Sequence, residues 1–83
     1  MKTAFIVNSV AVRRSRGRWQ RVEDRIKSNG HKAADFWMTE SLGEATRLAG
    51  QAVESGCQMV VAVGGDGTVN EVVNGLFRNG APL

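Results

Sequence analysis

Residues 60–71, with the sequence VVAVGGDGTVNE, constrain the fold of this chain more than any other stretch. A short apolar segment leads directly into three glycines, and an amphipathic helical pattern follows at once. This order is typical of a buried strand, a tight turn and a helix, where turn N–H groups and the helix N-terminus meet. Because Gly64, Gly65 and Gly67 lack a Cβ, the chain can take positive φ values there and let a ligand approach the backbone closely. The pattern predicts a site for nucleotide phosphates.

Two familiar phosphate-binding turns do not describe this run. A P-loop requires a lysine directly after its last glycine, and none follows here. The dinucleotide fingerprint requires a third glycine where this chain has Asn70. The glycine turn therefore belongs to neither class.

Strand and helix patterns alternate along the whole chain, without repeats or linkers. Apolar runs predict strands over residues 3–8, 32–38 and 58–63. Apolar residues at helical spacing follow each of them. The predicted fold class is α/β, with three βα units that form a parallel sheet flanked by helices.

Two capping boxes predict where helices begin. Ser41 with Glu44 fits the S/T-x-x-E pattern before the second helix, and Thr68 with Glu71 fits it before the third. Gly75 inside the third helix costs up to ~1 kcal/mol relative to alanine. Close packing of Gly75 against the sheet or a neighbouring chain would explain that cost.

Polar residues that follow different strands are expected to converge. In an open parallel sheet, ligands bind outside the carboxyl ends of the strands. Asn8, Thr39 and the glycine turn each follow a separate predicted strand. Helix capping alone could also account for Asn8 and Thr39, because both residue types favour such positions. The predicted nucleotide-binding residues are Asn8, Thr39, Gly64, Gly65, Asp66, Gly67, Thr68, Val69, Asn70 and Glu71.

Asp66 is the one carboxylate within the turn, and two roles are open for it. It could accept backbone N–H bonds and hold the loop in shape, or it could position Mg²⁺ beside the phosphates. Direct contact with phosphates requires an intervening cation, because like charges repel. Of the next residues, Glu71 suits a cap partner and Asn70 could face the nucleotide.

Residues 64–76, GGDGTVNEVVNGL, resemble the signature of the diacylglycerol kinase catalytic domain, in particular its bacterial lipid kinases. Asn8 matches the asparagine of that family's N-P-x-S-G turn, and Thr39 matches the threonine after its second strand. The resemblance implies binding of ATP and Mg²⁺ and phosphorylation of a lipid hydroxyl. It also implies that residues 1–83 are a partial N-terminal nucleotide-binding domain. The family's general base and its C-terminal lipid-binding β domain are then expected outside this fragment.

The chain departs from the family after Asn8, where the proline and the Ser-Gly turn are missing. Ser9 and three apolar residues stand there instead, followed by arginines. Gly17 is the candidate for a displaced turn glycine. This departure leaves the local contacts of the first turn open.

Basic residues gather in the first thirty positions, which hold eight basic and two acidic side chains. Arg13, Arg14, Arg16 and Arg18 could contact an anionic membrane surface or nucleotide phosphates, although a solvated surface is the simpler alternative. No nucleic-acid motif accompanies them, so nucleic acid is not an expected partner. The single cysteine, Cys57, excludes an intramolecular disulfide and suits a cytoplasmic protein, with peripheral membrane contact as an extension.

Two other functions are compatible with the same residues. The GGDG string also occurs in NAD kinases, which phosphorylate a nucleotide hydroxyl, and the two families differ in sequence beyond Leu83. A truncated, non-enzymatic module that forms a homo-oligomer through an exposed sheet edge is the second alternative.

Overall fold

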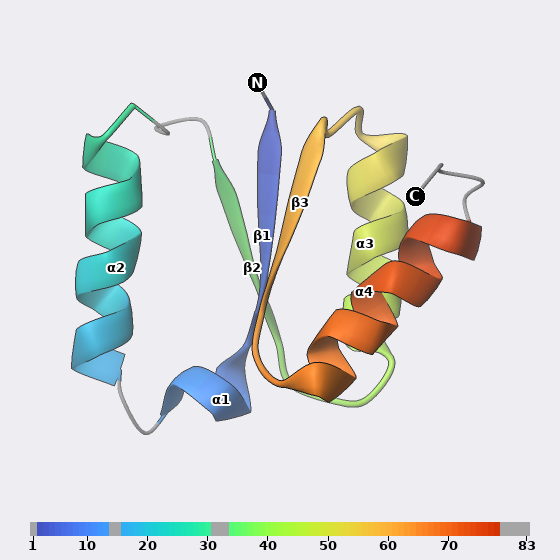
Figure 1. The fold of residues 1–83 in the computed structure, drawn as a ribbon, viewed down its shortest axis with the longest axis horizontal. Helices are drawn as coiled ribbons and strands as arrows, with labels where there is room; N and C mark the ends of the chain where they lie inside the picture. Colours follow the sequence, from blue (N-terminus) through green and yellow to red (C-terminus); the bar gives the residue numbers. More distant parts are fainter. Residues whose placement is uncertain (1, 14–15, 31–33, 79–83) are drawn as a thin grey trace.

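Strands and helices alternate along the chain in the computed structural model, which describes residues 2–13, 16–30 and 34–78 (Figure 1). The elements, in chain order, are β1 (Thr3–Asn8), α1 (Ser9–Arg13), α2 (Arg16–Ser28), β2 (Asp35–Thr39), α3 (Glu44–Glu54), β3 (Met59–Val63) and α4 (Asp66–Arg78). The predicted α/β fold with three βα units is confirmed.

The strand β1 lies in the middle of a three-stranded sheet with the order β2-β1-β3. Both neighbours run parallel to it: Asn8 lies opposite Thr39 of β2, and Val7 lies opposite Val63 of β3. Because β1 is covered on both faces, its sequence is a continuous apolar run, and Ile6 and Val7 are completely buried. This pattern explains why the predicted bounds of β1 match the observed ones.

The helices cover the two faces of the sheet unequally. The chain leaves β1 towards β2 in one direction and reaches β3 on the other side, so right-handed crossovers place α2 and α3 on opposite faces. Figure 1 shows α2 alone on one face, with α3 and α4 together on the other. Successive β1 side chains alternate between these faces.

The face under α3 and α4 contains the close-packed core. Its buried members are Ile6, Ala45, Ala49 and Val72. A Cβ on Gly75 would overlap the carbonyl oxygen of Thr46 and come within 2.7 Å of the Ala49 Cβ. Gly75 is therefore required for close packing, but its partner is α3 and not the sheet or a neighbouring chain.

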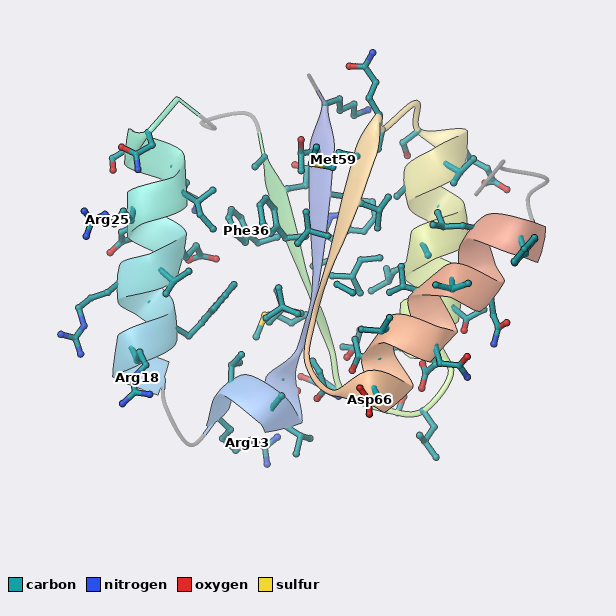
Figure 2. All side chains as sticks on the ribbon, in the orientation of Figure 1. Arg13, Arg18, Arg25, Phe36, Met59 and Asp66 are labelled. Atoms are coloured by element: carbon teal, nitrogen blue, oxygen red, sulfur yellow. The ribbon has the colours of Figure 1, made fainter. Side chains whose placement is uncertain are left out.

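Aromatic side chains fill part of the face under α2. Phe5 and Phe36 stack with ring centroids 4.7 Å apart, and Trp19 meets Phe36 edge-on at 6.2 Å. The Lys27 ammonium lies 5.2 Å from the centre of the Phe36 ring. Figure 2 shows Phe36 between α2 and the sheet. Met59, on β3, remains 46% exposed, so the covering of this face is incomplete.

Several predicted boundaries are wrong, and the α4 start is the most informative. This helix begins at Asp66, so Thr68 lies inside its first turn and does not cap it. After β1 the chain forms the short helix α1 in place of a turn, and Gly17 lies within α2.

The other two strands are shifted slightly from their predicted ranges. The strand β2 runs over Asp35–Thr39, and the first two residues predicted for it, 32 and 33, lie outside the described residues. The strand β3 begins one residue later than predicted. Neither shift moves the residues that follow the strands away from the sheet's carboxyl edge.

Candidate nucleotide site

The carboxyl ends of β1 and β3 lie side by side where the direction of the crossovers changes. Ligands of open parallel sheets bind at such a point. Asn8 ends β1, and Gly64 directly follows β3. The helix α1 and the start of α4 lie at this same end of the sheet (Figure 1). The fold therefore brings Asn8 and the glycine turn together, two of the three parts of the predicted site.

The Asn8 side chain links these two segments. Its Oδ1 accepts hydrogen bonds from the N–H groups of Val10 and Ala11 at 2.9 and 3.2 Å, which caps α1. Its Nδ2 donates to Thr68 Oγ1 at 3.0 Å. Asn8 and Thr68 thus hold the two segments against each other, a contact between residues 60 positions apart that the sequence pattern did not indicate.

Gly64 lies against this linkage and requires the absence of a side chain. A Cβ at this position would lie 2.5 Å from Thr68 Oγ1 and 3.0 Å from the Asn8 Cβ. Gly65 and Gly67 differ, because neither has a positive φ and a Cβ on either would meet nothing within 4 Å. These two glycines thus make no use of the positive φ values that glycine allows, but both leave open space beside the backbone.

The backbone of the turn presents hydrogen-bond donors to that open space. The Gly65 carbonyl accepts from the N–H groups of Thr68 and Val69 at 3.1 and 3.2 Å, which starts α4. The preceding N–H groups, those of Gly65, Asp66 and Gly67, donate to no acceptor within the described part of the chain. Together with the helix dipole, these donors create partial positive charge at the end of the sheet.

Asp66 is exposed at the first position of α4. Among residues 2–13, 16–30 and 34–78, its carboxylate has no hydrogen-bond or ion-pair partner, so no contact supports a role in holding the loop. Figure 2 shows Asp66 at the same end of the molecule as Arg13. The described residues contain no cluster of three or more His, Cys, Asp or Glu side chains that could coordinate a metal ion without other ligands. One exposed carboxylate fits a Mg²⁺ ion whose other ligands come from outside the described residues.

A small cavity brings Thr39, which ends β2, together with Asn8 and with Thr68 of α4. Its volume is about 190 Å³, and its lining comprises Asn8, Val10, Thr39, Glu40, Ser41, Leu42, Ala45, Thr68 and Glu71. Thr39 is buried, and its carbonyl accepts the Ser9 hydroxyl at 2.5 Å. Four predicted site residues thus meet at one cavity, whereas Val69 and Asn70 are exposed on α4 and do not line it.

Residues 40–43, here called the 40–43 loop, contribute Glu40, Ser41 and Leu42 to the lining of this cavity. Glu44 Oε1 accepts from the N–H groups of Glu40 and Ser41 at 2.6 and 3.2 Å. These two N–H groups, with help from Arg47, lower the pKa of Glu44. Only the glutamate half of the predicted capping box is therefore present: the helix begins at Glu44, and Gly43 at its N-cap provides no side-chain cap.

Comparison with known proteins identifies the family of this chain. The diacylglycerol kinase catalytic domain matches residues 2–83, which is nearly the whole chain. The chain therefore belongs to the diacylglycerol kinase catalytic domain family.

Individual relatives are lipid kinases by name. A probable YegS-like lipid kinase of Chromohalobacter salexigens is 46% identical over 54 residues, which cover 65% of this chain and 17% of that protein. A diacylglycerol kinase of Staphylococcus epidermidis is 42% identical over 52 residues, or 63% of this chain and 16% of that protein. The matched region thus spans less than a fifth of the length of these relatives.

Proposed function

We propose that this chain forms the ATP-binding part of a lipid kinase, which transfers the γ-phosphate of ATP to a lipid hydroxyl such as that of diacylglycerol. The observation that carries the proposal is the row of three N–H groups at residues 65–67, which have no acceptor in the described part of the chain and lie within the GGDGT sequence. Such donors at a helix N-terminus bind phosphate oxygens. Membership of a kinase family supports the same assignment.

The proposed contributions of the chain are positioning and charge stabilisation. Phosphoryl transfer depends mostly on these two effects, so backbone donors are adequate tools for it. The three N–H groups bind phosphate oxygens, and Asp66 together with those oxygens would hold Mg²⁺. When bound, Mg²⁺ supplies neutralisation of the charge on the phosphates.

The complete reaction is proposed for the whole protein. The lipid pocket and the general base are assigned to a part of the protein outside these 83 residues. We expect the 83-residue chain alone to bind ATP weakly and to phosphorylate no lipid.

A matched pair of substitutions tests the phosphate site. Gly65→Asp and Gly17→Asp both introduce a carboxylate where a Cβ meets nothing within 4 Å, so both variants are expected to fold. Only the first places negative charge beside the proposed phosphates, and we expect it to weaken Mg-ATP binding at least about tenfold, or about 1.4 kcal/mol. The measurement is an NMR titration of Mg-ATP into the ¹⁵N-labelled chain.

In the wild-type titration, the amide signals of residues 64–68 should respond most strongly. Equal affinities of the two variants, or a response centred away from the glycine turn, would contradict the proposed phosphate site.

We also propose that the arginines of the first segment bring the protein to an anionic membrane surface. Arg13 and Arg18 are exposed, and Figure 2 shows Arg25 on the side of α2 that points away from the sheet and Arg18 near the end of α2 where the helix begins. Arg14 and the Arg16 side chain, which belong to the same proposal, lie outside the described residues. No described helix has the length and apolar character needed to cross a bilayer.

Vesicle sedimentation measures this contact. Replacing Arg13 and Arg18 with glutamine should reduce binding to phosphatidylserine vesicles by about 2 kcal/mol, whereas Arg47→Gln on α3 should not. Equal binding of both variants would argue against membrane contact through these arginines.

A further inference from the structure

Glu71 is bound to α3 and to the loop that precedes it through both its side chain and its backbone. Its Oε1 accepts the Gly43 N–H at 3.0 Å, and its backbone carbonyl accepts the Thr46 hydroxyl at 2.8 Å. Glu71 lies on α4, only four positions after Gly67. Gly67 is the last of the three turn residues whose N–H groups have no acceptor in the described part of the chain. Glu71 therefore connects the helix that follows the proposed phosphate-binding turn to the 40–43 loop, whose residues 40–42 line the cavity.

The 40–43 loop depends on carboxylates for its shape. Three of its four N–H groups donate to glutamates: those of Glu40 and Ser41 to Glu44, and that of Gly43 to Glu71. Gly43 has a φ of +84°, a left-handed conformation that glycine adopts readily. The Leu42 side chain is 94% exposed, so it does not anchor the loop by apolar burial. Within the part of the chain that the structure describes, the hydrogen bond from Gly43 to Glu71 is thus the one hydrogen bond between this loop and α4.

We propose that Glu71 is a positioning residue of the nucleotide site, which holds the 40–43 loop through the Gly43 N–H and does not contact the triphosphate. A carboxylate facing the phosphates would repel them, whereas one that accepts an N–H bond from the loop has its charge directed away. The inference rests on the proposed function and specifies how the second wall of the site is held.

Two substitutions of Glu71 distinguish the effect of side-chain length from the effect of side-chain charge. Glu71→Gln keeps an oxygen at the same distance from Gly43 but removes the charge. Glu71→Asp keeps the charge but shortens the side chain by one methylene. The same two changes at Glu54, an exposed residue at the end of α3, are the matched controls.

Two measurements are made on the 83-residue chain: hydrogen exchange of the Gly43 amide without nucleotide, and the Kd for Mg-ATP. We expect Glu71→Gln to stay within about threefold of wild type in both, because a neutral oxygen still accepts the bond. We expect Glu71→Asp to lose Gly43 protection and ATP affinity by about tenfold, the size of one lost charged hydrogen bond. The Glu54 variants should match the wild type.

The opposite order overturns the inference: if Glu71→Gln binds ATP poorly while Glu71→Asp binds as wild type does, the charge acts on the ligand directly. Unchanged Gly43 exchange in Glu71→Asp also overturns it, because the contact would then not hold the loop. If the wild-type chain binds no ATP while Gly43 behaves as expected, the proposed function fails and the nucleotide role of Glu71 fails with it.

Discussion

The two faces of the sheet are covered by side chains of different size. Under α3 and α4, small residues such as Ala45 and Ala49 are completely or almost completely buried, and two helices approach each other over Gly75. Under α2, large aromatic rings supply the contact, yet Val22 is 43% exposed and Met59 46%. Small side chains permit close backbone approach and leave few voids, whereas the single helix α2 covers only part of its face.

This difference is relevant to function because the candidate site lies on the close-packed side. The cavity is lined by Thr68 and Glu71 from the start of α4 and by residues 40–42, which precede α3, so it lies at the ends of two closely packed helices. Binding sites need rigid support to keep their donors in place. The exposed basic residues lie on α1 and on the outer surface of α2, and surface charge needs no such precision.

Alanine substitutions at two glycines give the largest expected contrast. Gly75→Ala should destabilise the chain by about 2 kcal/mol, because the added methyl overlaps backbone atoms of α3. Gly17→Ala in α2 should stabilise it by about 0.5 kcal/mol, because a Cβ there meets nothing and alanine favours helix. Urea unfolding followed by circular dichroism measures both. Similar effects of the two substitutions would remove the proposed contrast between the faces.

The two tryptophans report on the two faces separately. Trp19 contacts Phe36 under α2, whereas Trp37 packs against the core under α3. In the variants Trp37→Phe and Trp19→Phe, one tryptophan remains in each. We expect the Trp19 signal to change at lower urea concentration, with a free energy of opening about 1 kcal/mol smaller. Coincident transitions would show that the faces unfold as one unit.

The smallest expected effect is a pH dependence of the 40–43 loop. Folding lowers the pKa of Glu44 below its ordinary value of 4.5, through the N–H groups of Glu40 and Ser41. A lowered pKa means that the ionised form is favoured in the folded state. The stabilisation is therefore present above pH 4.5 and is lost as the pH falls through the lower, folded-state pKa.

Amide exchange at Glu40 and Ser41, measured across this pH range, tests the effect. Their protection should decrease on acidification in the wild type and should be independent of pH in Glu44→Gln. A wild-type loop that keeps its protection in acid would show that the carboxylate does not hold it.

Local patterns predicted the strands and the fold class well, because burial of β1 leaves a clear apolar run in the sequence. Starts of helices were predicted less well. The Thr68 hydroxyl accepts a bond from Asn8, and the Glu71 carboxylate accepts one from Gly43, so neither forms the local capping box that their spacing indicates. Hydrogen bonds to residues distant in sequence replaced the local ones, and a short motif does not indicate which of the two a side chain will form. The roles of the site residues towards a nucleotide remain predictions.

The central position of β1 has a consequence for how the chain reaches its folded state. This strand precedes the other two along the chain, yet its pairing with β3 joins Thr3 to Met59, across 56 positions of sequence. Contacts so far apart along the chain slow folding, because a long loop must close before they form. During translation, one edge of β1 therefore stays without its partner until β3, the last of the three strands, has been synthesised.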